Sequence, residues 1–556
     1  MSTFWKRLLN LSLDPSGRQW IFVPYDQLTD SIGPLSRENP RNLGIVLIEN
    51  PWMAAQRPYH KQKLALIFSN MRHFALEQAA RGIAVRYVVA DGPCRNPLEK
   101  VAGEVGPLTV MAPAERELRT DIEPLITTGS IRIVPHEGWM TTPDMLRKVE
   151  KPGPQWRMDA FYREARRSCG ILMLKGKPLG GKYSHDPANR LPWKGTPDAP
   201  TPPKFQVDAV KGEVGLLITE KFSHHPGKLD LSAIPATKSD AEMLWAWAKE
   251  ECLEWFGPYE DAMSTKSSGL FHTRISSLLN IHRLLPNRVV ADVEALDIPI
   301  QSKEGFIRQV LGWREFVHHV HTITDGFRQG LEPLPQVLTK PGDGGYRTWA
   351  GKAWSSKSTI NDPHGGACPN RLGAQNLLPP AFWGEPSGLH CLDSVVSSVW
   401  RDAYSHHITR LMVLANIATL LDVNPRQLTD WFWIAYADAY DWVVEPNVLG
   451  MGTYAVGPLM TTKPYVSGAN YINRMSDFCR ECQFDPENNC PITPLYWAFL
   501  ARHEPVLQVN PRLSLVMKSL YRREGPSRER DKRFYDFMTT RFCEGVPVRR
   551  NDLRNL

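Results

Sequence analysis

The chain has 556 residues, of which 42% are hydrophobic and 22% charged, a composition typical of a globular protein with two or three domains. No apolar run approaches the roughly 18 residues that a membrane-spanning helix needs, and the first residues lack the apolar stretch of a secretory signal. We therefore expect a cytoplasmic protein. The formal net charge of +7 permits a nucleic-acid partner without establishing one.

The first part of the chain alternates between predicted strands and helices. Apolar runs predict strands at residues 20–23, 43–48, 83–89, 108–111 and 131–134, with helices over 60–81 and from Ala114 onward. This order predicts a doubly wound parallel sheet. We place this α/β domain at residues 18–150, after an N-terminal extension at 1–17. No GxGxxG motif follows the first strand, which argues against a dinucleotide there.

The rest of the chain divides into a linker and a helical domain. Residues 151–239 are rich in proline, glycine and lysine, which indicates a long interdomain linker with a few ordered pieces. From residue 240 to 556, helix-length amphipathic segments dominate, for example at 241–256, 305–320, 393–421 and 425–440. The predicted fold is therefore an α/β domain with a doubly wound parallel sheet, followed by a large all-α domain.

Three of the nine cysteines lie close together in the sequence: Cys479, Cys482 and Cys490, the last followed by proline. A CxxC pair brings two thiolates within reach of one metal centre, and a Cys-Pro end is common in iron–sulfur ligand runs. A fourth ligand must come from elsewhere, and Cys391 can supply it. On spacing alone, an iron–sulfur cluster, a structural zinc site and inert thiols all remain open.

Two further features of the helical part stand out. One predicted helix contains Arg308, Trp313, Arg314 and Glu315. These residues are either a specific functional cluster or part of an ordinary helix that forms ion pairs and packs its tryptophan in the core. His406 and His407 lie in the middle of the predicted 393–421 helix. They are either a satisfied histidine pair or groups for acid–base chemistry, since histidine titrates near neutral pH.

These motifs resemble one known family. The run Arg308–Phe316 reads RQVLGWREF and resembles the RQxxxWREF signature of photolyases and cryptochromes. The segments Tyr259–Met263 and Leu270–Ser276 resemble the family's flavin-binding entry, and Tyr25–Leu28 is similar to its GDQL motif, with tyrosine in place of glycine. The cysteines narrow the resemblance to the iron–sulfur branch, which includes prokaryotic (6-4) photolyases. Further matches to that branch are Tyr454, Lys463–Gly468 and Asn470–Ile472.

The resemblance implies a set of site residues. The ligands of a [4Fe-4S] cluster would be Cys391, Cys479, Cys482 and Cys490. FAD would be held by Tyr259, His272, Thr273 and Ser276, enclosed by Arg308 and Trp313, with Arg410 paired to Asp438 beside the isoalloxazine ring. The lesion would be flanked by His406 and His407, and electrons would travel through Trp431 and Trp383. The candidates for binding an antenna, 6,7-dimethyl-8-ribityllumazine, are Asp26, Gln27 and Glu49.

The function that the resemblance implies is light-driven repair of (6-4) photoproducts in DNA by electron transfer from reduced FAD. We expect a monomer that associates with the nucleoid when bound to UV-damaged DNA. The alternative is a blue-light photoreceptor without repair activity, and a third possibility, repair of cyclobutane dimers, is disfavoured by the histidine pair.

Two departures from the family pattern motivate the receptor alternative. Val444 stands where a polar side chain usually faces flavin N5, unless a register shift brings in Glu445 or Asn447. Phe432 stands where a redox-active tyrosine is an option, so that Trp433 or another aromatic residue would have to take over.

Overall fold

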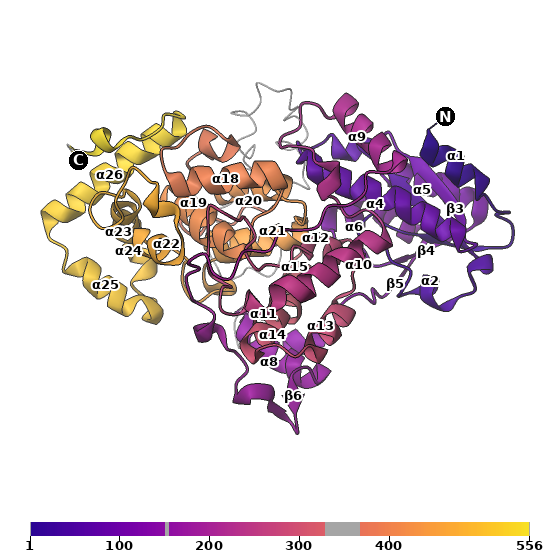
Figure 1. Ribbon diagram of the computed structural model, residues 1–556, viewed down its shortest axis with the longest axis horizontal. Coiled ribbons are helices and arrows are strands. Elements are labelled where there is room, and N and C mark those ends of the chain that lie inside the picture. Colours follow the sequence, from indigo (N-terminus) through magenta and orange to yellow (C-terminus); the bar gives the residue numbers. More distant parts are fainter. Residues whose placement is uncertain (1, 151–154, 329–366, 555) are drawn as a thin grey trace.

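The structure is a computed structural model that describes residues 2–150, 155–328, 367–554 and 556. Figure 1 shows the strands and helices of the α/β part gathered at the N-terminal end of the molecule, with the C-terminal helices at the opposite end. No helix in these described ranges has the length and apolar character needed to cross a bilayer.

The N-terminal sheet has five parallel strands in the order β3-β2-β1-β4-β5. They are β1 (Gln19–Phe22), β2 (Leu43–Glu49), β3 (Ala84–Val89), β4 (Leu108–Met111) and β5 (Ile131–Val134). Every residue of β2 is buried, as its unbroken apolar run requires for a strand covered on both faces. The connecting helices are α4 (Lys61–Ala80), α5 (Arg95–Val105) and α6 (Arg116–Thr127). The predicted doubly wound sheet is confirmed, and its direction of winding reverses between β1 and β4.

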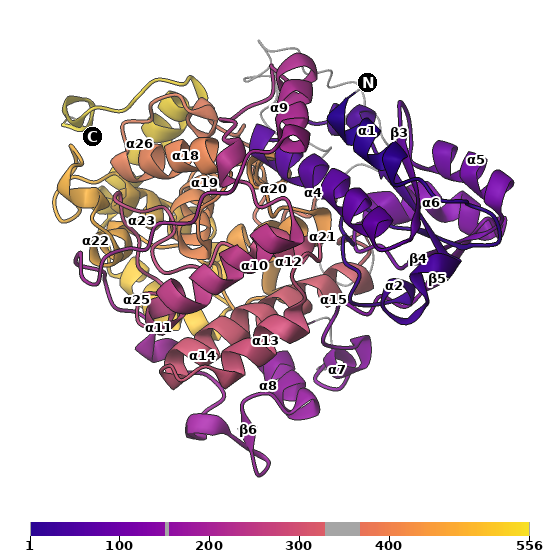
Figure 2. The ribbon, with the colours of Figure 1, turned by 45° about the vertical axis from the view of Figure 1, so that its right-hand side comes forward.

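Both segments outside the two predicted domains contain helices. In the N-terminal extension, α1 (Thr3–Asn10) buries Phe4 against Tyr87, with ring centroids 4.7 Å apart. In the predicted linker, α8 (Met158–Cys169) lies beside α13 (Pro286–Ala295) and α14 (Ile300–Ile307) of the helical part (Figure 2). The second linker helix, α9 (Ala209–Lys221), packs instead on α4. The linker thus contributes to the surfaces of both domains.

π-helical turns interrupt several of the predicted helices in the helical part. The 241–256 helix consists of α10 (Lys238–Trp247), a π turn η5 (Ala248–Cys252) and α11 (Leu253–Phe256). The 305–320 helix consists of the end of α14, a π turn η6 (Arg308–Arg314) and α15 (Glu315–Ile323). Such wide turns are frequent at functional sites. The remaining larger elements are α12 (Ser276–Asn280), α20 (Pro425–Ala435), α21 (Asp441–Val444), η9 (Glu445–Gly452), α22 (Ala469–Met475), α23 (Ile492–Arg502), α25 (Ser514–Tyr521) and α26 (Gly525–Cys543).

The prediction of one continuous helix over 393–421 is wrong. The first helix, α18 (His390–Asp402), ends at Ala403, which has a left-handed φ of 51°. The chain re-enters helical structure in the π turn η8 (Thr409–Ala415) and α19 (Asn416–Leu420). The break is held by tertiary contacts, because the Ala403 carbonyl accepts from Ala437 N and the Ser405 and Tyr436 hydroxyls bond at 2.8 Å. His406 and His407 therefore lie at the start of a second helix and not mid-helix.

His60 joins the two domains at the N-terminus of α4. Its Nδ1 accepts a hydrogen bond from Gln62 N at 3.0 Å, so that Nε2 carries the proton donated to the Trp400 carbonyl at 3.1 Å. Burial lowers the pKa of His60 to about 4 from an ordinary 6.5. As the pH falls from 6.5 toward 4, His60 is protonated in the unfolded chain but stays neutral in the folded chain. The free energy of unfolding therefore decreases over this pH range.

We predict that His60→Asn flattens the pH dependence of urea unfolding. Asparagine keeps an acceptor for the helix N-terminus but does not titrate, which removes a penalty of about 2 kcal/mol at about pH 5. The control is His224→Ala, because His224 is exposed. An unchanged pH dependence in His60→Asn would show that His60 is not held neutral.

Candidate functional site

A cavity of about 1200 Å³ opens among the helices of the C-terminal domain. Its walls come from α8, α12, η6, the segment that follows the break at Ala403, the α20–η9 region and residues 463–466. The predicted linker contributes Lys182–Ser184, Asp186 and Arg190 to the wall. A single concave site thus collects side chains from segments distant in sequence, which is the usual form of a cofactor site.

A buried ion pair lies in the cavity wall. Arg410 donates to Asp438 through two bonds of 3.0 and 2.9 Å, and the Ser276 hydroxyl donates to the same carboxylate at 2.7 Å. Burial alone would raise the pKa of Asp438, but the charge of Arg410 and these hydrogen bonds outweigh it, and the pKa is lowered. The cavity wall therefore contains an ion pair whose geometry is fixed by three hydrogen bonds.

Arg308, the first residue of the signature run, sits among three carboxylates. It lies 2.9 Å from Asp186, 3.1 Å from Glu260 and 3.3 Å from Glu304. Glu260 also accepts from Gln309 at 2.6 Å. The guanidinium is therefore surrounded by protein carboxylates, which fixes the start of the π turn η6 against the linker.

Three histidine rings meet in the cavity. His272 and His406 stack with centroids 4.5 Å apart and an interplanar angle of 11°, and His407 lies edge-on to His272 at 5.3 Å. Burial, followed by the charges of Arg308 and Arg410, lowers the pKa of His407 to about 3, and burial also lowers that of His272 to about 3. The ring nitrogens lie within 4.8 Å of one another, but the lone pairs of two stacked parallel rings cannot point at one ion. The cluster fits hydrogen bonding better than metal binding.

Arg314 and Glu315 of the signature hold the two domains together. Glu315 accepts from Met140 N and Thr141 N, both at 3.0 Å, in the segment that follows β5. The Arg314 guanidinium lies 4.2 Å above the Trp139 ring and 5.3 Å from Trp442. Trp313 lines the cavity, as the resemblance implied, whereas Glu315 serves as an interdomain tie.

The two departures from the family pattern both face the cavity. Val444, Asn447 and Phe432 are among its lining residues. Glu445 does not take the place of Val444, because its buried carboxylate bonds to His321 at 2.9 Å and Arg426 at 2.8 Å on the other side. Asn447 folds its amide back onto the Val443 carbonyl at 2.8 Å. The wall at Val444 is therefore apolar.

Three tryptophans form a contiguous row that leads away from the cavity. Trp431 is packed behind Phe432 at 5.2 Å, Trp400 contacts Trp431 at 5.8 Å, and Trp383 stacks on Trp400 at 5.7 Å. Trp431 is fully buried and Trp383 is half-buried. Sequence reasoning named the two ends and missed Trp400, because ring contacts between separate elements leave no trace in residue spacing.

The four predicted cysteine ligands line one small apolar cavity. Cys391 lies in the first turn of α18, Cys479 in the turn after α22, and Cys490 directly before α23, with Cys482 between them. Burial, together with the neighbouring thiol groups, raises the pKa of Cys479 to about 11 and that of Cys490 to about 12. The site therefore favours neutral thiols unless a cation replaces their protons.

The type of ligand leaves more than one metal open. Four thiolates can hold a single structural zinc ion or an iron–sulfur cluster. The four cysteines share one small cavity whose other lining residues are apolar.

The three antenna candidates lie at the sheet, away from the cavity. Asp26 follows β1 at the point where the winding reverses, and neither oxygen of its buried carboxylate has a hydrogen-bond partner. Burial raises its pKa to about 7. Gln27 donates to the Met111 carbonyl at 3.0 Å. Glu49 is paired with Arg72 at 2.8 and 2.7 Å and accepts from Tyr87, so its carboxylate is already occupied.

The structure therefore brings most of the predicted residues together but not all. The cavity is lined by His272, Thr273, Ser276, Arg308, Trp313, His406, His407, Arg410 and Asp438. Tyr259 is not among its lining residues, since its hydroxyl donates to the Thr196 carbonyl at 3.2 Å outside. Glu260, directly after it, does line the cavity, together with Arg274 and Tyr404, which sequence reasoning did not name.

Comparisons with known proteins agree with one another. Residues 21–233 match the family described as deoxyribodipyrimidine photo-lyase-related protein. The chain is 31% identical over 514 residues to a (6-4) photolyase of Agrobacterium fabrum, covering 89% of this chain and 94% of that protein. A cryptochrome of Synechocystis shares the fold, with a TM-score of 0.50 at 14% identity over 78% of this chain and 82% of that one. A class III photolyase of Agrobacterium tumefaciens gives a TM-score of 0.49 at 15% identity, over 95% and 99% of the two chains.

We predict that Asp438→Asn lowers the thermal unfolding midpoint strongly. Removing one partner leaves the Arg410 charge buried and unpaired, which typically costs about 3–5 kcal/mol. The matched control is Glu242→Gln, whose pair with Arg288 is exposed and worth at most about 1 kcal/mol. Equal midpoints for the two variants would show that the Arg410–Asp438 pair does not support the cavity.

Proposed function

The chain belongs to the photolyase and cryptochrome family, and we propose that it repairs (6-4) pyrimidine–pyrimidone photoproducts in DNA under light. Membership of this family implies FAD as its cofactor. The observation that carries the proposal is that one cavity places His406 and His407 beside the buried Arg410–Asp438 pair. The relative named (6-4) photolyase, which is matched over 94% of its length, supports the same substrate.

The cavity fits the cofactor that the family implies. Its volume of about 1200 Å³ exceeds that of most small-ligand sites, as a dinucleotide-sized molecule requires. His272, Thr273 and Ser276 would hold it, Arg308 and Trp313 would enclose it, and Arg410 would face the ring system with Asp438 behind it. When bound and reduced, FAD supplies one electron to the lesion under light and takes it back after repair. The damaged pair costs less to flip into the cavity than a sound one.

The histidines would handle the proton that the rearrangement needs. Without cofactor and DNA, His407 is neutral near pH 7, because burial and the charges of Arg308 and Arg410 lower its pKa to about 3. The phosphates of the cofactor and of bound DNA bring negative charge to the same cavity, and negative charge raises a histidine pKa. We infer that His407 becomes a proton donor when both are bound, assisted by His406.

The test is light-driven repair by FAD-loaded protein of an oligonucleotide that holds one (6-4) photoproduct. His407→Ala should lower the repair rate about a hundredfold or more, the usual contribution of a general acid, without weakening binding of the damaged DNA. His224→Ala is the control. Wild-type repair by His407→Ala would remove this role. No repair by FAD-loaded wild-type protein would favour the photoreceptor alternative, to which the apolar wall at Val444 and Phe432 points.

We also propose that the four cysteines hold a [4Fe-4S] cluster. The support is that all four cysteines of the family pattern line one small apolar cavity, where a positively charged metal centre would replace their protons. Such a cluster would join the start of α18 to the segment before α23 and close a long loop of the helical domain. Its role would therefore be structural.

Cys479→Ser is expected to give insoluble or flavin-poor protein, because the loop loses its cross-link. Anaerobically purified wild-type protein should contain iron and labile sulfide and be brown. Cys543→Ser is the control, because Cys543 is exposed and outside the cluster. Zinc in place of iron, or a soluble, flavin-replete and repair-competent Cys479→Ser protein, would contradict the proposal.

A light-harvesting chromophore is the third component that we propose. The edge of the sheet where β1 and β4 diverge is the usual ligand position of such folds, and the unpartnered carboxylate of Asp26 supports a ligand there. 6,7-dimethyl-8-ribityllumazine would bind between Asp26 and Gln27. Glu49 would act indirectly, through its pair with Arg72.

The row Trp431–Trp400–Trp383 would carry electrons from the surface to the cofactor. Arg314 lies over the Trp139–Trp442 pair, and its positive charge disfavours a positive hole on those two rings. Trp400→Phe should therefore slow light-driven reduction of bound FAD by an external reductant. The control is Trp433→Phe, off the row on the same helix as Trp431. An unchanged rate in Trp400→Phe would exclude Trp400 as a relay.

A further inference from the structure

Glu445 is a buried carboxylate directly behind the cofactor cavity. It is 1% exposed and follows Val444, the last residue of α21, at the start of the π turn η9. Val444, Asn447, Val448 and Met451 line the cavity, whereas Glu445 does not. Its side chain therefore lies on the side of the 444–451 segment that faces away from the cavity.

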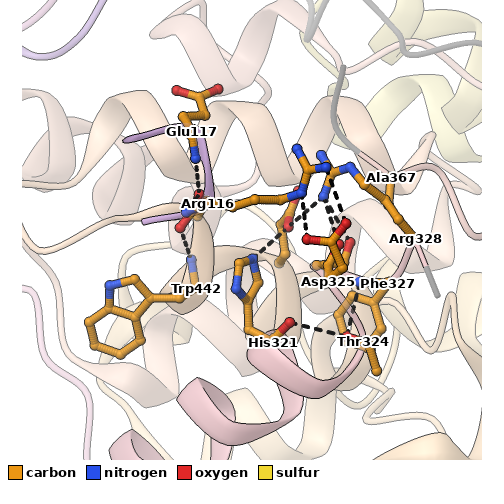
Figure 3. A network of polar contacts seen from close by, with 12 residues as sticks. Arg116, Glu117, His321, Thr324, Asp325, Phe327, Arg328, Ala367 and Trp442 are labelled. Carbon is orange, nitrogen blue, oxygen red and sulfur yellow. Dashed lines mark hydrogen bonds and ion pairs between the residues drawn. The ribbon is translucent and has the colours of Figure 1, made fainter. Parts of the chain in front are cut away.

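The Glu445 carboxylate is held by basic groups. His321 Nε2 bonds to Oε2 at 2.9 Å, Arg426 donates to Oε1 at 2.8 Å, and Arg328 lies 3.7 Å away. Burial would raise the pKa of Glu445, but these groups outweigh it and lower the pKa to about 2. The charge is thus permanent, and the network around His321 and Arg328 is shown in Figure 3.

The backbone is shaped to reach this carboxylate. Gly326 has a φ of 64°, and a Cβ at that position would lie 2.5 Å from Glu445 Oε2. The turn after α15 therefore passes directly over the carboxylate, which only glycine permits here. Thr324 stabilises the same turn by accepting from Phe327 N at 3.0 Å (Figure 3).

The other end of the wall segment is fixed from the α/β domain. Asp441 accepts from Arg116 N at 2.7 Å and Glu117 N at 3.3 Å, at the N-terminus of α6 (Figure 3). A carboxylate at a helix N-terminus is stabilised by the unpaired N–H groups there. Arg116 also pairs with Asp325 at 2.7 Å, in the turn that covers Glu445. The segment Asp441–Glu445 is therefore clamped at both ends by one connected network.

From this arrangement we propose that Glu445 is a positioning residue for the cofactor cavity, fixing Val444 and Asn447 at its wall without touching its contents. The proposal rests on the proposed binding of FAD in this cavity. The π turn η9 spaces its backbone hydrogen bonds more widely than an α-helix does. The ion pairs of Glu445 on the side away from the cavity stabilise this turn, which carries the lining residues Asn447 and Val448.

The test compares Glu445→Gln with Asp430→Asn in FAD-loaded protein. Both variants remove one carboxylate from Arg426, but Asp430 is 15% exposed and belongs to α20, outside the segment that forms the wall. Glu445→Gln should weaken FAD binding about tenfold, shift the midpoint potential of bound FAD, and move the methyl resonances of Val444. Asp430→Asn should leave all three unchanged, and Glu445→Asp, which keeps the charge, should recover most of the affinity.

The outcomes separate this proposal from the proposed function. If wild-type protein binds no FAD, the proposed function fails. If wild-type protein binds FAD and Glu445→Gln matches it in affinity, potential and Val444 resonances, the positioning role is wrong. If Glu445→Gln does not fold, Gly326→Ala, which pushes a methyl group against the carboxylate, should produce the same three shifts. Unchanged values in a folded Gly326→Ala protein would overturn the proposal.

Discussion

The buried pair of Arg410 and Asp438 is the constraint on which the rest of the site depends. A guanidinium taken out of water needs a carboxylate and further hydrogen bonds to compensate for lost hydration. Arg410 finds them in Asp438 and in the Ser405 carbonyl at 2.8 Å, and Asp438 in turn accepts from Ser276. The pair thereby joins three elements: α12, the π turn η8 that contains Arg410, and the segment after α20.

This constraint explains where the histidines lie. For Arg410 to reach Ser405 and Asp438 together, the chain must turn before it, and the helix breaks at Ala403. The break places His406 and His407 at the start of the helix that follows it, where both line the cavity beside His272. A continuous helix through these residues would have turned one of the pair away from the cavity.

The Trp-Arg-Glu signature has a second, structural role. Trp313 faces the cavity, while Arg314 and Glu315 bind Trp139, Met140 and Thr141 beyond β5. The same residues that mark the family in sequence thus hold the α/β domain against the cofactor wall. Together with Asp441 at the N-terminus of α6, they give the two domains a shared, buried polar interface.

Much of this structure was predictable from local pattern. Apolar runs such as that of β2 and the alternation of strands and helices predicted the sheet, and the family resemblance predicted nine of the residues that line the cavity. The break at Ala403, the π turns and the relay residue Trp400 were not predictable, because contacts between distant segments impose them. The same is true of Asp186, which comes from an apparent linker and neutralises Arg308. Tyr259 shows the reverse, since a matching motif residue lies outside the cavity.

The central claim is that this cavity acts on (6-4) photoproducts. The most direct measurement mixes FAD-loaded wild-type protein with two oligonucleotides, one carrying a (6-4) photoproduct and one a cyclobutane dimer, and follows both lesions in light and darkness. The account predicts light-dependent loss of the (6-4) photoproduct alone. Loss of the cyclobutane dimer instead, or no loss of either lesion with FAD bound, would contradict it.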